Sequence, residues 1–295
     1  MPNWNEVLDE INHEGRFSPL DIIRHKYLKL LNQKTGRNII CYYSGWLQKP
    51  EFPSSIDDND KNGLMTTIHG LDHSLGLDLI LHTPGGNVAA TESIVHYLRT
   101  IFNDEIRVFV PQIAMSAGTM IACASKEIFM GKESNLGPID PQFGGIPAHG
   151  VLDEFNRAVQ EVKDDPKSLP IWQTVIQKYH PTFLGECKQA IELSSQLVTC
   201  WLKEVMFKDQ NDAASKAASI VSTLNNHADT KTHSRHIHFQ EAIDMGLNVT
   251  MLEEDQGLQD LVLTIHHAYM HTLANTRAVK IIENHKERAM IQSIN

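Results

Sequence analysis

Residues 110–125 read VPQIAMSAGTMIACAS and join three kinds of local sequence. An apolar run typical of a buried strand ends near Pro111, a turn of small residues follows, and a helix of small apolar residues comes next. Ser116 lies at the joint between the turn and the helix. A serine at this position either caps the helix or presents its hydroxyl as a nucleophile among the free N–H groups of a helix N-terminus. The surrounding chain has to decide between these two interpretations.

The sequence around this stretch alternates between buried strands and amphipathic helices. Apolar or β-branched runs predict strands at 38–44, 77–83, 106–111 and 127–131. Helical spacing follows the second of these runs at 88–102, after the glycine turn HTPGGN. Strand, turn and helix in repeated succession indicate an α/β fold in which right-handed crossovers connect parallel strands.

Helical segments precede, interrupt and follow this core. Helical periodicity at 4–12 and 19–33 predicts an N-terminal helical arm covering residues 1–37. The main domain is expected at 38–254, with a helical insertion at about 151–225 and a last strand within 237–253. Residues 255–295 are expected to form a C-terminal helix, at 256–275, and a polar tail. No low-complexity linker separates these parts, which favours one domain.

Two glycine-bearing turns, HTPGGN (82–87) and AMSAGT (114–119), follow two successive strands. Both are expected at the carboxyl edge of a parallel sheet, where α/β proteins build their sites. The backbone N–H groups of Gly86 and Ala117, with Gly85 beside them, can then form an oxyanion hole for a Ser116 nucleophile. Either turn alone is explained by local structure, but their pairing favours a catalytic site.

These motifs resemble the Clp protease/crotonase superfamily. The resemblance is carried by LILHTPGGNVAATESIVHYLR, VFVPQIAMSAGTMIACAS and IFMGKESNLGPIDPQFGG, and it is closest to the branch of signal peptide peptidase A and the serine dehydrogenase proteinases. The SAGT turn followed by GPIDPQ is specific to the latter family. The resemblance covers 38–145 well and 230–250 loosely, where HIHFQEAIDMGLNV is similar to the closing helix and strand of the superfamily.

The resemblance implies a spiral of ββα units with serine peptidase activity toward a peptide or protein substrate, without a metal or other cofactor. It also implies a closed homo-oligomer. By motif, Ser116 corresponds to the family nucleophile, and Gly86 and Ala117 correspond to the oxyanion donors.

The general base does not carry over directly from the family pattern. Clp proteases place a histidine about 25 residues after the nucleophile, whereas this chain has Asp140 in that place. The Clp-type aspartate would fall near 229–233, where the chain offers Asp229 and His233. The imidazole and the carboxylate are therefore expected to have exchanged places.

A lysine base, as in signal peptide peptidases, is the alternative. Lys163, Lys167 and Lys178 lie in the appropriate range, although none stands in a recognisable motif. An imidazole titrates near neutral pH, whereas a lysine needs an apolar pocket to lose its proton. We therefore favour Ser116–His233–Asp140 over a Ser116–Lys178 dyad.

Composition excludes several other classes of function. The formal net charge of −10 argues against a nucleic-acid-binding surface, and no apolar stretch is long enough to span a membrane. The N-terminal residues lack the basic and apolar blocks of a signal peptide, and the four cysteines show no CxxC spacing. Buried, reduced thiols in a cytoplasmic protein are expected.

Two patterns that could suggest metal binding are interpreted otherwise. DDNDKNG (57–63) starts like an EF-hand loop, but His69 stands where the bidentate glutamate is required. His233, His236 and His238 have no accompanying HExxH or paired-cysteine motif. We expect no metal site in either place.

A broad apolar stripe at helical spacing runs through 183–207. It exceeds what one short sheet can cover, so we expect a homo-oligomer larger than a dimer.

Two rival functions remain open at this point. The chain can be an interaction scaffold that has lost turnover, or a crotonase-type enzyme acting on a CoA thioester, whose chemistry needs two backbone N–H donors but no serine at a helix start.

Overall fold

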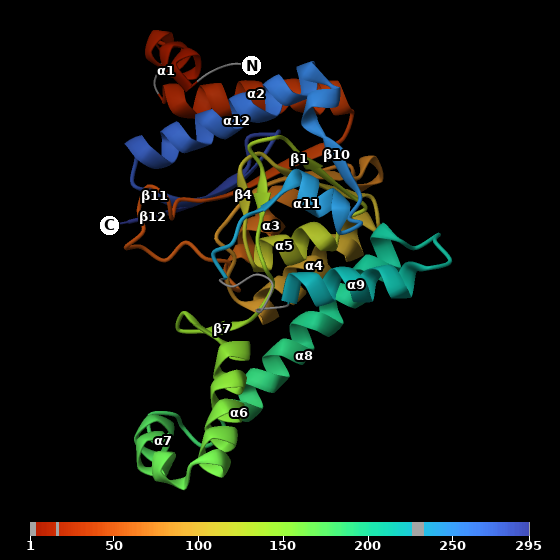
Figure 1. Ribbon diagram of the computed structural model, residues 1–295. Coiled ribbons are helices and arrows are strands. Elements are labelled where there is room, and N and C mark those ends of the chain that lie inside the picture. Colours follow the sequence, from red (N-terminus) through yellow and green to blue (C-terminus); the bar gives the residue numbers. More distant parts are fainter. Residues whose placement is uncertain (1–3, 16–17, 226–232, 295) are drawn as a thin grey trace.

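The computed structural model describes residues 4–15, 18–225 and 233–294, and a seven-stranded sheet forms the centre of this part of the chain (Figure 1). The strand order is β10-β5-β3-β2-β1-β11-β12, and all neighbours from β10 to β1 are parallel. The strands of this sheet are β1 (Asn38–Ser44), β2 (Leu77–His82), β3 (Ile106–Val110), β5 (Glu127–Met130), β10 (Val249–Met251), β11 (Ala278–Asn284) and β12 (Ala289–Ser293). A small three-stranded sheet contains β4 (Ile113–Ala114), β6 (Asn135–Leu136) and β9 (Ile237–His238). A two-stranded sheet contains β7 (Gln142–Phe143) and β8 (Ile146–Pro147).

Both faces of the sheet are covered, which explains why its parallel strands β1, β2, β3 and β5 are mostly apolar. In β1, Ile39 and Tyr43 pack on one face beneath α2 (Pro19–Thr35) and α12 (Gln256–Asn275). Ile40 and Tyr42 point to the opposite face, because successive side chains of a strand alternate. That face is covered by α3 (Asp60–Ile68), α4 (Val88–Phe102) and α5 (Ala117–Cys123).

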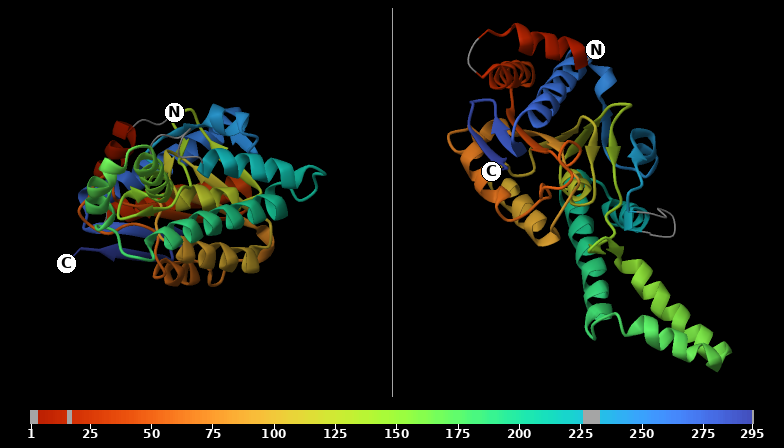
Figure 2. Two further views of the ribbon diagram at one scale, coloured as in Figure 1. Left: turned by 60° about the horizontal axis from the view of Figure 1, so that its bottom comes forward. Right: turned by 90° about the vertical axis from the view of Figure 1, so that its left-hand side faces the viewer.

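The remaining helices lie at the N-terminus, in the insertion and just before β10. They are α1 (Trp4–His13), α6 (Ala148–Asp164), α7 (Leu169–Ile176), α8 (Phe183–Trp201), α9 (Ala213–Asn225) and α11 (Phe239–Asp244). Helices α6, α7 and most of α8 extend away from the body as an arm, and α8 returns the chain to it (Figures 1 and 2). The predicted α/β class and the helical insertion are confirmed.

The C-terminal segment differs from the expected polar tail. After α12 the chain forms the hairpin β11–β12, and β11 pairs antiparallel with β1 inside the main sheet. Lys280 and Glu283 gave this segment its polar character, yet both are about 1% exposed. Each has a buried partner, because Lys280 pairs with Asp60 and Glu283 pairs with Arg24. Paired charges can be buried at tolerable cost, and the tail prediction was wrong for this reason.

The cysteines follow the expectation with one exception. Cys41, Cys123 and Cys187 are buried and free, but Cys200 is exposed on α8. Burial raises the pKa of the Cys123 thiol to about 12. Within the described residues, no helix combines the length and hydropathy needed to cross a membrane.

A buried aromatic cluster beneath α12 predicts a strong dependence of stability on pH. The rings of Tyr43, Trp46 and His266 surround His82, and burial lowers the pKa of His82 to about 3. An unfolded histidine titrates near 6.5, so the unfolded chain binds a proton that the native state excludes between about pH 6.5 and 3. The contribution of His82 to the free energy of unfolding is fully present above this window. It decreases by about 1.4 kcal/mol for each pH unit as the pH falls through the window.

Urea unfolding between pH 7 and pH 4.5 measures this effect. A His82→Phe variant keeps an aromatic ring and removes the titration, so its stability should fall less steeply with acid than that of the wild type, by about that slope. Parallel stability curves for the two proteins would show that His82 does not contribute to the acid sensitivity.

Candidate active site

Ser116 sits in a tight turn between β4 and α5. The N–H of Gly118 donates to the Met115 carbonyl at 2.7 Å, which closes a four-residue turn with Ser116 in its second position. The backbone of Ser116 has φ 51° and ψ −114°, a conformation that glycine adopts far more readily. Strain of this kind typically costs about 1–3 kcal/mol and is concentrated at functional sites. The turn therefore holds Ser116 in a backbone conformation that a serine does not favour on its own.

The Gly85–Gly86 turn lies directly against Ser116. A Cβ on Gly85 would stand 2.7 Å from both the Met115 carbonyl oxygen and the Ser116 Cβ, and Gly85 has φ +94°. Any other residue would push the two turns apart. The hydroxyl oxygen of Thr83 accepts the Gly85 N–H at 3.1 Å and so fixes the start of the turn.

The segment around Ile56 orients the Gly86 amide. The Ile56 N–H donates to the Gly85 carbonyl at 2.8 Å, and the Ile56 carbonyl accepts the Asn87 N–H at 2.9 Å. The N–H of Gly86 belongs to the same trans peptide as the Gly85 carbonyl and points the opposite way, away from Ile56. A Cβ on Gly86 would collide with the Ile56 backbone, so only glycine permits this approach.

Ala117 supplies a second amide beside the first. It is the first residue of α5, so its N–H has no helical carbonyl four residues earlier to bond. A Cβ on Gly85 would lie only 3.0 Å from this nitrogen, which shows how close the two turns are. The amides of Gly86 and Ala117 therefore lie in two adjacent turns, with Gly85 packed between them.

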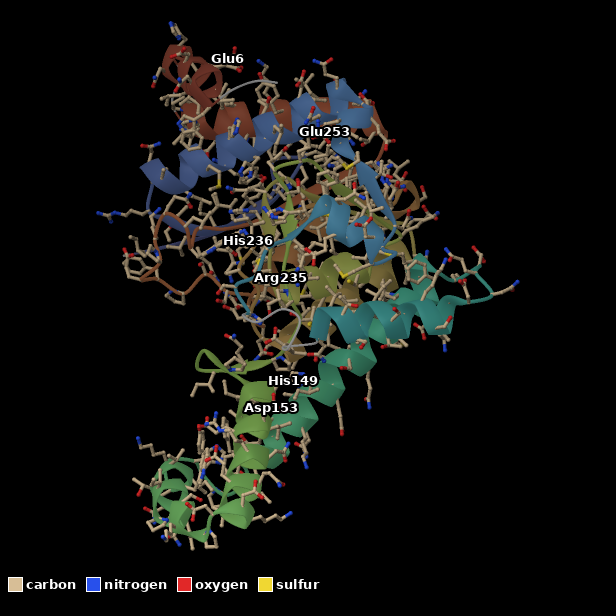
Figure 3. All side chains as sticks on the ribbon, viewed as in Figure 1. Glu6, His149, Asp153, Arg235, His236 and Glu253 are labelled. Carbon is tan, nitrogen blue, oxygen red and sulfur yellow. The ribbon has the colours of Figure 1, made fainter. Side chains whose placement is uncertain are left out.

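His233 and Asp140 form a hydrogen-bonded pair. Asp140 is fully buried, His233 is 19% exposed, and the His233 Nδ1 lies 2.8 Å from the Asp140 Oδ1. A carboxylate oxygen only accepts, so a neutral imidazole that donates from Nδ1 keeps its lone pair on Nε2. The two residues are 93 positions apart in the sequence. In Figure 3, Arg235 and His236 mark the chain just after His233, and His149 marks the first turn of α6.

A cavity of about 520 Å³ brings these groups together. It is lined by Ser55, Pro84, Gly85, Gly86, Asn87, Val88, Ala89, Ser116, Ile139, Pro141, Gln142, Phe143, Ala190 and His233. The serine, the glycine turn and the imidazole therefore line one cavity, and the two neighbours of Asp140 form part of its wall.

The alternative bases lie elsewhere. Lys178 is exposed in the connection between α7 and α8, on the arm, and does not line this cavity. Lys163 and Lys167 also belong to the arm, and Asp229 lies outside the described residues. Among the residues described, no group of three His, Cys, Asp or Glu side chains is arranged to hold a metal ion.

Three parts of the cavity wall were missed by the sequence reasoning. Ser55 comes from a proline- and serine-rich loop, Phe143 from the small hairpin β7–β8, and Ala190 from α8 on the arm. Apolar residues at helical spacing in α8 indicated a packing surface, and nothing in that spacing distinguishes Ala190 from its neighbours. The Gly144–Gly145 pair was the one available signal for the hairpin.

Comparisons with known proteins show which family the chain resembles. The family model of ClpP-like SDH-type serine proteinases matches residues 20–289, which is more of the chain than the sequence motifs alone cover. Uncharacterized protein MJ0137 of Methanocaldococcus jannaschii is 28% identical over 272 residues, which are 90% of this chain and 85% of that protein. Uncharacterized protein MJ1495 of the same organism is 36% identical over 111 residues, 38% of this chain and 37% of that protein.

No solved structure matches the chain. The family match nevertheless includes the turns of Gly86 and Ser116, the insertion and most of the β11–β12 hairpin. This chain belongs to the family of ClpP-like SDH-type serine proteinases.

Proposed function

We propose that this protein hydrolyses peptide bonds, with Ser116 as the nucleophile, His233 as the general base and Asp140 as the residue that orients the imidazole. The observation that carries the proposal is the convergence of Ser116, Gly86 and His233 on one cavity. The 2.8 Å contact between His233 and buried Asp140 supports it further, because it leaves the other imidazole nitrogen available as a base.

The geometry suggests the following sequence of steps. The Ser116 Oγ attacks the carbonyl carbon of the scissile peptide while its proton passes to the His233 Nε2. The carbonyl oxygen becomes negative, and the N–H groups of Gly86 and Ala117 stabilise it. The imidazolium, held by Asp140, then gives its proton to the leaving amine, and the acyl group remains on Ser116 until water hydrolyses the ester.

A fluorophosphonate probe tests this proposal on the purified protein. A serine activated in this way should form a covalent adduct, which mass spectrometry should locate on the peptide that contains Ser116. An unlabelled protein that turns over a CoA thioester would instead support a crotonase-type activity. An unlabelled protein with neither activity would support an interaction scaffold.

We also propose that the arm mediates self-association into a homo-oligomer. Its surface carries an apolar groove of about 370 Å³ between α6 and α7, lined by Phe155, Val159, Leu169, Trp172 and Ile176 among others. Ile171 on α7 is 69% exposed, and Val159 on α6 is 56% exposed. Exposed apolar surface gathered on one protruding element is typical of protein–protein interfaces. A second copy of the chain, with the same arm, is the proposed partner.

Light scattering at micromolar concentration checks the assembly. The wild type is expected to be larger than a dimer, and the double variant Val159→Asp/Ile171→Asp should shift toward smaller species because it places charges in the contact. Gln189→Asp, an exposed substitution on α8, is the matched control and should keep the wild-type mass. A monomeric wild type would contradict the proposal.

A further inference from the structure

The loop that contains Ser55 and Ile56 forms one side of the proposed oxyanion hole. Ile56 and Gly86 form an isolated parallel bridge, and the two backbone hydrogen bonds of Ile56 hold the peptides on either side of Gly86. Much of this loop has no regular secondary structure of its own. Its position therefore depends on contacts from outside the loop.

Lys280 provides one of these contacts. It lies on β11, is 1% exposed, and its Nζ donates to the Ser55 carbonyl at 2.8 Å and to the Asp60 Oδ1 at 2.7 Å. The Asp57 carboxylate lies 3.5 Å away. A buried ammonium needs hydrogen-bond acceptors and opposite charge, which the Ser55 carbonyl and Asp60 supply through hydrogen bonds and Asp57 supplements through an ion pair.

The other oxygen of Asp60 completes the network. Asp60 is fully buried, and its Oδ2 accepts the Tyr42 hydroxyl at 2.7 Å and the Asp57 N–H at 2.9 Å. The same carboxylate thus bonds Lys280 through one oxygen and the end of the loop through the other. Residues Ser55 and Asp57, on either side of Ile56, are both bonded to this buried pair.

We propose that Lys280 is a positioning residue for the oxyanion hole: its ammonium, together with Asp60, fixes the Ser54–Asp57 loop so that Ile56 aims the Gly86 N–H into the cavity. This inference rests on the proposed peptidase function. Lys280 touches neither Ser116 nor the cavity, and it acts only through the backbone of the loop.

A displaced oxyanion donor has a characteristic kinetic effect. The hydrogen bond from Gly86 strengthens as negative charge develops on the substrate oxygen, so its loss affects the transition state more than the bound substrate. Removing such a donor outright typically costs about 10²–10³-fold in kcat, and misaiming it should cost about 10–100-fold. KM should change by less than about threefold, because ground-state binding does not use this bond.

The kinetic test compares three variants of the full chain on a peptide substrate. Lys280→Met should lower kcat as described. The pair Lys280→Met/Asp60→Asn removes both buried charges, so it should recover thermal stability while kcat stays low. Lys286→Met, in the exposed turn of the same hairpin, is the control and should match the wild type. Recovery of kcat together with stability in the pair variant would overturn the proposal, because Lys280 would then serve only to neutralise Asp60.

Amide hydrogen exchange tests the same inference independently of turnover. The Ile56 N–H donates to the Gly85 carbonyl, and the Asn87 N–H donates to the Ile56 carbonyl. Both amides should therefore exchange slowly in the wild type and faster in Lys280→Met and in the pair variant. Unchanged protection in both variants would overturn the role of Lys280. If the wild type shows no turnover, the proposed function fails, and the exchange of these two amides alone decides the positioning role.

Discussion

Ser116→Ala is expected to abolish fluorophosphonate labelling and to reduce peptide hydrolysis by about 10⁴-fold or more, because the nucleophile is lost. Alanine keeps the Cβ of serine, so the backbone at φ 51° carries the same constraint and the contact with Gly85 is unchanged. The unfolding midpoint and the circular dichroism spectrum should therefore match those of the wild type. Labelling kinetics and a peptidase assay on the two proteins provide the measurement.

Ser55 offers a matched control in the same cavity. Ser55 lines the cavity, and its contact with Lys280 is made by its backbone carbonyl. Ser55→Ala should accordingly retain labelling and most of the turnover. Equal labelling of wild type and Ser116→Ala would remove the nucleophile assignment, and loss of labelling in Ser55→Ala alone would move it to that residue.

The second large effect is expected for His233. His233→Ala should lower turnover by about 10³-fold or more, because the serine hydroxyl then has no neighbour to take its proton. Lys178→Ala should retain most of the activity, since Lys178 is exposed on the arm and does not line the cavity. Single-turnover acylation measured with an activated ester reports this step directly.

Asp140→Asn extends the test to the orientation of the imidazole. An asparagine can present its NH₂ group to the His233 Nδ1, which favours the wrong tautomer and leaves no lone pair toward Ser116. A loss approaching that of His233→Ala is expected, with little change in KM. If Lys178→Ala were inactive and His233→Ala active, the base would be Lys178. Full activity in both variants would mean that the base is neither residue.

Local sequence patterns predicted the parts of the molecule that depend on local interactions. The strands β1, β2, β3 and β5 are covered on both faces, so their positions are buried except for the partly exposed Arg107 and Glu127, and the runs stand out in the sequence. Helix α4 begins after the cap Asn87, whose side chain accepts the Ala90 N–H at 2.9 Å, and its predicted bounds agree with the structure. The glycine turns were visible for the same reason, since close backbone approach requires glycine there.

Residues whose environment is made by distant partners were the ones that could not be placed with certainty. The candidates Asp140, His233 and Lys178 came from a resemblance, and the choice among them rested on the ordinary pKa ranges of histidine and lysine, because spacing along the chain does not say which side chains meet. The C-terminal hairpin was predicted as a polar tail, and the sequence does not show that its charged residues Lys280 and Glu283 have buried partners. Charge is a reliable signal of exposure only for groups without a buried counter-charge.

The sequence by itself therefore determined the parallel α/β core, the two glycine turns and the position of Ser116 at a strand–helix joint. Only the tertiary structure decided that His233 meets Asp140, that both glycine turns and the imidazole share one cavity, and that Lys280 reaches the loop beside Gly86. The physical reason is the range of the interactions. Periodicity and turn chemistry act over a few residues, whereas the base, the cavity and the buried ion pairs arise where segments far apart in the chain pack against one another.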